Sequence, residues 1–268
     1  VRLHYVDLGE GPSRVLIHGA SGTLRDWTFS LTERLGDRFR VIAIDRPGHG
    51  YSGRLARDGA DPEAQARLFA AAAAALGAGR VLIAGHSWGG ALAVAWALNR
   101  PDQVAGAAII AGATQPWGGD GGLLYRLGAG PLSPAVGALA RLYAGDGGAE
   151  GLIAGIFAPD PVPPGYADHI GVELALRPDT FRWNAEDIDR LNGHLARISP
   201  RYGELSTPME IIHGDADEIV GLDIHSIPLS RTARNARLTV LKGVGHMPHH
   251  AREDEVIAAL DRLAAAAQ

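Results

Sequence analysis

Short apolar runs rich in β-branched residues alternate with longer helical patterns along most of the chain. This alternation is typical of an α/β fold, in which helices cover both faces of a mostly parallel twisted sheet. The first run alternates apolar and polar residues, so we expect an antiparallel edge strand there. The predicted strands are Leu3–Leu8, Val15–Ile17, Val41–Ile44, Val81–Ala84, Val104–Ile110, Met209–Ile212 and Leu238–Leu241.

Five segments carry the apolar spacing of helices that pack against such a sheet. Pro62 suits the first turn of one helix, and Pro101 marks a stop after another. The predicted helices are Leu24–Leu35, Pro62–Leu76, Gly90–Asn99, Asp223–Arg234 and Glu253–Ala266.

The strand–helix rhythm breaks between Gln115 and Thr207, where glycine and proline become frequent and helical stretches carry Trp183 and Leu191. Insertions of this kind lie over the carboxyl edge of a sheet, where active sites form. We therefore predict one α/β core domain made of residues 1–114 and 208–268, with residues 115–207 inserted as a helical lid.

Composition excludes several classes of partner. The 268 residues carry a formal net charge of -5 and no cluster of basic residues, so we expect no nucleic-acid partner. Without cysteine the chain has no disulfide or thiolate metal ligand. No apolar run reaches the ~18 residues that span a bilayer, so we expect a soluble domain. The sequence predicts neither the oligomeric state nor the compartment: it starts at Val1 without methionine, which leaves room for an upstream targeting or anchoring segment, with the cytoplasm as one alternative.

The motif Gly85-His86-Ser87-Trp88-Gly89 follows one predicted strand and precedes one predicted helix. A nucleophilic serine projects from such a sharp strand-to-helix turn, and the crowded backbone there requires small residues two positions to either side. The helix N-terminus also stabilises negative charge beside the serine. We predict that Ser87 is a nucleophile.

An acid and a base for such a serine should follow later strands. Asp215 and Asp217 follow the strand Met209–Ile212, and the last strand is followed by three histidines: His246, His249 and His250. The aspartates lack the rest of a calcium loop. No second carboxylate or cysteine group with ligand spacing accompanies the histidines, so we predict no metal and no cofactor, and interpret His249 and His250 as helix-entry residues.

Together these motifs resemble the α/β-hydrolase family, and in particular its lidded esterase and lipase-like members, over nearly the whole chain. By this resemblance His18-Gly19-Ala20-Ser21-Gly22 is the oxyanion loop, and the backbone N–H groups of Ala20 and Trp88 form the oxyanion hole. The resemblance also selects Asp217 over Asp215 as the acid and His246 as the base. The chain order serine, aspartate, histidine is the one this fold uses.

Two further segments resemble structural parts of the family. His18 is interpreted as structural, and so is the turn Asp45–Ser52 after the strand Val41–Ile44. Gly48, Gly50 and Gly53 spell a dinucleotide-binding pattern, but no helix starts at the last glycine and position 68 is leucine instead of an acid. We therefore reject a nucleotide cofactor.

The expected activity is hydrolysis of a small-molecule carboxylic ester through an acyl-enzyme intermediate. Hydrolysis of carbon–carbon bonds, lactone opening and perhydrolysis by the same triad are alternatives, and a receptor-like binding protein on this fold is an alternative of another class. Family members with an aspartate nucleophile, such as haloalkane dehalogenases and epoxide hydrolases, are disfavoured by Ser87. The candidate lining of an apolar substrate pocket is Trp27, Leu123, Leu124, Phe157 and Phe181.

Overall fold

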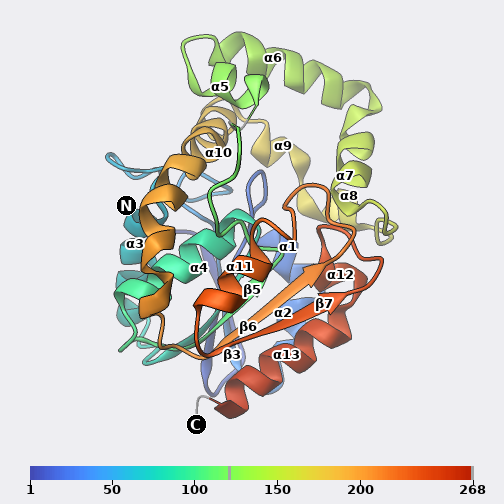
Figure 1. Ribbon diagram of the computed structural model, residues 1–268. Helices are drawn as coiled ribbons and strands as arrows, with labels where there is room; N and C mark the ends of the chain where they lie inside the picture. Colours follow the sequence, from blue (N-terminus) through green and yellow to red (C-terminus); the bar gives the residue numbers. More distant parts are fainter. Residues whose placement is uncertain (120–121, 267–268) are drawn as a thin grey trace.

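The computed structural model describes residues 1–119 and 122–266, and these residues form a seven-stranded sheet with helices on both faces (Figure 1). The strand order is β1-β3-β2-β4-β5-β6-β7, with β1 antiparallel to β3 and every other pairing parallel. The strands are β1 (Tyr5–Leu8), β2 (Ser13–Ile17), β3 (Arg40–Ile44), β4 (Val81–His86), β5 (Val104–Ile110), β6 (Met209–Gly214) and β7 (Ala236–Leu241).

Helices α3, α4 and α11 pack on one face of the sheet, and α1, α2 and α13 pack on the other. The helices are α1 (Arg25–Thr28), α2 (Leu31–Gly36), α3 (Pro62–Ala75), α4 (Trp88–Asn99), α5 (Leu123–Ala129), α6 (Ser133–Tyr143), η1 (Ala144–Gly148), α7 (Ala149–Phe157), α8 (Tyr166–Ile170), α9 (Val172–Ala175), α10 (Pro178–Ile198), η2 (Ser199–Glu204), α11 (Ser226–Thr232), α12 (Pro248–Ala251) and α13 (Glu253–Ala266). Among the described helices, none is both long and apolar enough to cross a membrane.

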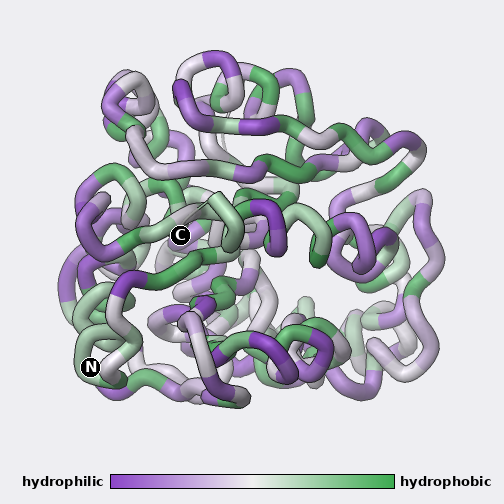
Figure 2. The backbone as a smooth tube through the Cα atoms, turned by 90° about the horizontal axis from the view of Figure 1, so that it is seen from below, coloured by the Kyte–Doolittle hydropathy of each residue, from purple (hydrophilic) through white to green (hydrophobic). Residues whose placement is uncertain are grey.

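The core is built on the central strand β4, which is buried at every position. Side chains on the two faces of β4 belong to two apolar clusters. One cluster lies under α3 and α4, and the other lies under α1, α2 and α13. Helix α4 is buried at every position except its last, Asn99, because it lies between the sheet, α3 and α10. Along the whole chain hydrophobic stretches alternate with hydrophilic ones, as expected for elements that each bury one side (Figure 2).

All seven predicted strands are present, and the first is the antiparallel edge strand that its alternation indicated, although it starts at Tyr5 instead of Leu3. The predicted helix Leu24–Leu35 is wrong as a single element. It is broken into α1 and α2 at Ser30, whose φ of -153° is not helical and whose hydroxyl donates to Glu253 of α13. The predicted helix Asp223–Arg234 is shorter, because only Ser226–Thr232 is helical.

Between β5 and β6 the chain forms α5 to α10. Helices α5 to α9 lie beyond the carboxyl ends of the parallel strands, whereas the C-terminal part of α10 packs beside α4 in the core (Figure 1). The long helix α10 is tied to the core by a buried ion pair. The Arg46 guanidinium, which follows β3, donates to Asp187 on α10 at 2.8 Å, and both side chains are fully buried. Arg54 donates to the other oxygen of Asp187 at 2.7 Å.

Because Arg46 is buried, we expect Asp187→Asn to leave a positive charge without its counterion inside the protein. The free energy of unfolding should fall by about 3 kcal/mol, as is usual when one partner of a buried pair is removed. Guanidinium-induced unfolding measures this change. The control Glu186→Gln removes a partly exposed partner of Arg54, and it should lower the free energy of unfolding by less than about 1 kcal/mol. Equal stability of the two variants would contradict the assigned role of the pair.

Candidate active site

Ser87 occupies a strained turn between β4 and α4. Its φ of 52° lies in the left-handed region that side chains other than glycine rarely adopt. The turn is fixed by β5 and the segment after it, since the Ser87 N–H donates to the Ile110 carbonyl and the Ser87 carbonyl accepts from Ala113. A Cβ atom on Gly85 would lie 2.2 Å from the Gly89 carbonyl oxygen, so the backbone passes there at a distance that only glycine permits.

The segment after β2 lies against this turn. A Cβ atom on Gly19 would lie 3.0 Å from that of Ser87, which places the predicted oxyanion loop beside the serine. Among the hydrogen bonds of the described residues, the N–H groups of Ala20 and Trp88 have no protein acceptor. Both groups are therefore free to donate to a bound oxygen atom.

His18 is structural in its contacts, as its interpretation required. Its Nδ1 donates to the Gly19 carbonyl at 2.8 Å and its Nε2 accepts from the Arg46 backbone N–H at 2.8 Å. Burial and the nearby charge of Arg46 lower the pKa of His18 to about 4. The ring thus remains neutral and links the oxyanion loop to the turn after β3.

The structure brings together the histidine after β7 and the second aspartate after β6. His246 Nδ1 lies 2.8 Å from Asp217 Oδ2, and both side chains are buried. The other oxygen, Asp217 Oδ1, accepts the backbone N–H groups of Ile219 and Val220, each at 2.9 Å. Asp215 is exposed and instead accepts the Gly243 N–H at 2.6 Å, which is a turn-capping contact.

Sequence reasoning missed His213 at the end of β6, a second histidine at this carboxylate. Its Nε2 lies 3.1 Å from Asp217 Oδ2 and 2.7 Å from the Val220 carbonyl, while its Nδ1 accepts from the Ser226 hydroxyl at 2.6 Å. Burial alone would raise the pKa of Asp217, but the hydrogen bonds from His213 and His246 hold it well below its usual range. Asp217 therefore stays ionised and fixes the orientation of His246.

The predicted pocket residues differ widely in their exposure to solvent. Trp27 and Phe157 are almost fully buried, Phe181 is half-buried on α10, and Leu123 and Leu124 are exposed on α5. Trp27 packs in the core on the α1 and α2 side of the sheet.

Trp88 contributes its backbone to the turn, while its side chain serves packing. The indole Nε1 donates to the Asp187 carbonyl at 3.0 Å, and the Arg46 guanidinium lies 4.0 Å from the ring centroid. The nucleophile turn is thus joined to α10 through this side chain.

A separate cavity of about 510 Å³ lies between the edge of the sheet at β1 and the segment that contains α8 and α9. His4, Arg25, Tyr51 and Asp168 are among its lining residues, which include none of the predicted catalytic or pocket residues. The cavity is therefore distinct from the site at Ser87.

Comparisons with known proteins identify the family of the chain. The sequence model described as the alpha/beta hydrolase family matches residues 15–259. The chain is 37% identical over 122 residues to haloalkane dehalogenase 2 of Mycobacterium bovis, a match over 44% of this chain and 41% of that protein. It is 34% identical over 118 residues to 2-hydroxy-6-oxononadienedioate/2-hydroxy-6-oxononatrienedioate hydrolase of Burkholderia vietnamiensis, a match over 42% of this chain and 41% of that protein.

Both curated relatives are thus matched over less than half of their own length.

The crystal structure of a putative lipase from Acinetobacter baumannii superposes with a TM-score of 0.79 over 99% of this chain and 88% of that chain. Its sequence identity of 21% makes this a likeness of fold alone.

We predict that Ser87 is unusually reactive toward a fluorophosphonate probe, because a serine nucleophile served by a histidine base attacks phosphorus readily. Mass spectrometry of the digested protein should find the probe on the peptide that contains Ser87. His246→Ala should reduce the labelling rate at least 100-fold, since the base is removed. Labelling of another serine, or labelling that persists in His246→Ala, would contradict the site.

Proposed function

The chain belongs to the alpha/beta hydrolase family, and we propose that it is a serine hydrolase that cleaves carboxylic esters through an acyl-enzyme intermediate. The observation that carries the proposal is the pairing of His246 with the ionised Asp217, together with a serine on the turn at the start of α4. A base that is oriented by a carboxylate and serves a serine is the arrangement of acyl transfer.

In the proposed reaction, His246 accepts the proton of Ser87 while the serine oxygen forms a bond to the ester carbonyl carbon. The resulting oxyanion accepts hydrogen bonds from the backbone N–H groups of Ala20 and Trp88. Each of these bonds lowers the activation free energy by about 3 kcal/mol. Collapse of the tetrahedral intermediate breaks the bond to the alcohol, which leaves with the proton from His246. Water then attacks the acyl group by the same steps and restores Ser87.

We also propose that residues 115–207 act as a lid over this site. The support comes from contacts with all three catalytic segments: Asn184 on α10 accepts the Ser21 N–H at 2.6 Å, and Asp160 accepts the Gly245 N–H at 2.8 Å. The third contact is that of the Trp88 indole with α10. Movement of these helices would therefore displace or break contacts of the segments that carry the serine, the oxyanion loop and the histidine.

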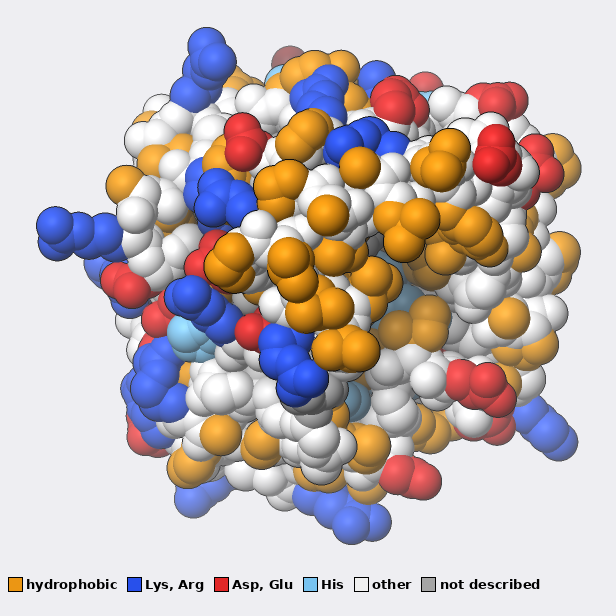
Figure 3. Space-filling view, turned by 90° about the horizontal axis from the view of Figure 1, so that it is seen from above, with side chains coloured by type: hydrophobic (Ala, Val, Ile, Leu, Met, Phe, Trp, Pro, Cys, Tyr) orange, Lys and Arg blue, Asp and Glu red, His pale blue; other side chains and the backbone are white. Residues whose placement is uncertain are grey.

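The outer face of this segment is apolar. Seen from above, hydrophobic side chains gather around a hollow (Figure 3). The large exposed apolar residues of α5 to α7 and their connections are Leu123, Leu124, Leu132, Leu139, Leu142, Tyr143 and Leu152. Such a surface suits an ester with a hydrophobic acyl chain or alcohol.

Hydrolysis of a carbon–carbon bond by the same triad is the second candidate, and the relative from Burkholderia vietnamiensis favours it. That relative is named for a dicarboxylic acid, and arginine is a common partner of a bound carboxylate because its guanidinium can donate two parallel hydrogen bonds. Arg46, which reaches the Gly19 carbonyl at 3.3 Å, is already paired with Asp187. This pairing favours a neutral ester. The serine at position 87 likewise speaks against the chemistry of family members with an aspartate nucleophile.

The proposal predicts multiple turnovers on p-nitrophenyl esters in a series from two to sixteen acyl carbons, with a preferred chain length set by the pocket. Ser87→Ala and His246→Ala should each lower kcat by at least 10³-fold, since the nucleophile or its base is lost. Release of p-nitrophenol measures the rate. Turnover that is indifferent to both substitutions would refute the esterase, and a single stoichiometric binding event without turnover would favour a receptor-like protein.

The two aspartates after β6 provide a matched pair of variants. Asp217→Asn should lower kcat by roughly 10³- to 10⁴-fold, because the amide no longer stabilises the imidazolium or fixes its tautomer. Asp215→Asn should leave kcat within about twofold, because its contact is with the Gly243 N–H. The same ester assay compares both, and equal losses would show that Asp217 is not the orienting acid.

A further inference from the structure

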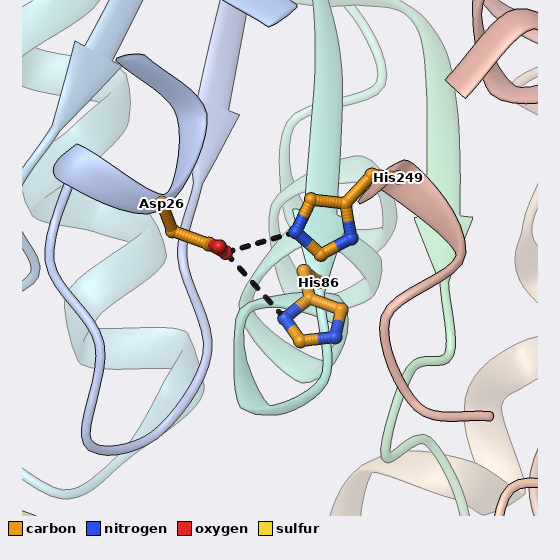
Figure 4. A group of neighbouring side chains, drawn as sticks. All are labelled: Asp26, His86 and His249. Atoms are coloured by element: carbon orange, nitrogen blue, oxygen red, sulfur yellow. Dashed lines mark hydrogen bonds and ion pairs between the residues drawn. The ribbon is translucent and has the colours of Figure 1, made fainter. Parts of the chain in front are cut away.

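Three buried side chains from distant parts of the sequence converge behind the catalytic segments (Figure 4). Asp26 lies on α1, His86 ends β4 and His249 lies on α12. Their exposed fractions are 4%, 4% and 0%, and the proposed reaction uses none of them. In Figure 4 both imidazole rings turn a nitrogen toward the carboxylate.

The tautomer of His86 is fixed by its surroundings. Its Nε2 lies 2.9 Å from the backbone carbonyl oxygen of His246, and because a carbonyl only accepts, this nitrogen carries the proton. Nδ1 of the neutral ring then presents a lone pair, and it lies 3.9 Å from Asp26 Oδ2. Two electron-rich atoms thus face one another in a region without water access.

His249 is incompletely satisfied. Its Nε2 lies 3.0 Å from Asp26 Oδ2, while its Nδ1 is buried without a hydrogen-bond partner. This nitrogen makes no contact that fixes which of the two ring nitrogens carries the proton. Either ring nitrogen can carry the proton, so Nε2 is able to offer its lone pair toward Asp26.

We propose that Asp26 Oδ2, His86 Nδ1 and His249 Nε2 bind a divalent transition-metal ion of the zinc type. Two neutral imidazoles and one carboxylate are ligands that zinc and cobalt prefer. The three ligand atoms lie within 4.8 Å of one another. Bonds of about 2.1 Å place tetrahedral ligands roughly 3.4 Å apart, so closure around the ion requires shifts of about an ångström at most.

The surrounding contacts match those of a metal site. The carboxylate oxygen that is not a proposed ligand, Asp26 Oδ1, accepts hydrogen bonds from the Tyr166 hydroxyl and from His250 Nε2, both at 2.8 Å. His86 uses its second nitrogen to donate to a backbone carbonyl. Metal-binding histidines and carboxylates are commonly oriented by contacts of this kind.

An ion at this position would join α1, β4 and α12, and hence the segments that flank the oxyanion loop, the nucleophile and the catalytic histidine. It would stabilise the fold without touching Ser87. The sequence alone predicted no metal at the histidine cluster, because no second carboxylate or cysteine group with ligand spacing accompanies it. The structure supplies that carboxylate from Asp26, 223 residues before His249.

The test uses Co²⁺ as a visible probe. Protein freed of metal with a chelator is titrated with Co²⁺, and because the site is buried, a second sample is unfolded and refolded with Co²⁺ present. We expect one Co²⁺ per chain, intense visible absorption bands of tetrahedral cobalt, a higher melting temperature and an anomalous diffraction peak between the three side chains. His249→Gln should weaken Co²⁺ binding at least 10-fold.

The control is His169→Gln, which removes a histidine that bonds to the Thr28 hydroxyl outside the cluster, and it should bind Co²⁺ as the parent does. Circular dichroism verifies that each variant folds. If His249→Gln does not fold, Asp26→Asn replaces it as the variant of the cluster. The proposal is overturned if neither parent sample binds Co²⁺, if the anomalous peak lies at His246 or at surface histidines, or if a folded variant of the cluster binds as the parent does.

Discussion

The backbone at Ser87 can turn only because the residues two positions to either side, Gly85 and Gly89, lack side chains. The chain leaves the central strand, adopts a φ of 52° and enters a helix that is buried almost throughout. Close approach of Gly85 to Gly89 allows this reversal, and the end of β5 holds it in place. The other groups proposed for catalysis follow the ends of β2, β6 and β7, because parallel strands bring their carboxyl ends to one edge of the sheet.

Buried polar contacts then connect the helices between β5 and β6 to that edge. Arg46 is shared between Asp187 on α10, the Gly19 carbonyl and the indole of Trp88. A charge at this depth is stable only with its counterion, so the position of α10 is fixed by electrostatics as well as by apolar packing. The predicted oxyanion loop and the nucleophile turn meet at the same guanidinium.

Local patterns predicted the sheet well, since buried strands such as β4 and β5 are continuous apolar runs that need no distant partner to be recognised. Ser30 and Glu33 have the spacing of a helix capping box, a local signal of a helix start that the prediction of a single helix overlooked. The contact of Ser30 with Glu253, by contrast, could not be read from the local sequence. The same holds for Asp26, whose histidine partners follow more than 200 residues later. A role for His213 near the acid could have been suspected from the sequence, because it immediately precedes the Gly-Asp turn in which the acid was predicted.

The contacts of α10 bear on how new specificities arise on this scaffold. A chimaera that exchanged residues 115–207 for the corresponding segment of a relative would replace both the side chain that accepts the Ser21 N–H and the counterion of Arg46. Recombination at these boundaries would therefore succeed only with donors that keep an amide at position 184 and a carboxylate at position 187. The segment between β5 and β6 is consequently not independent of the rest of the fold, and its divergence is constrained by the residues that it contacts in the core.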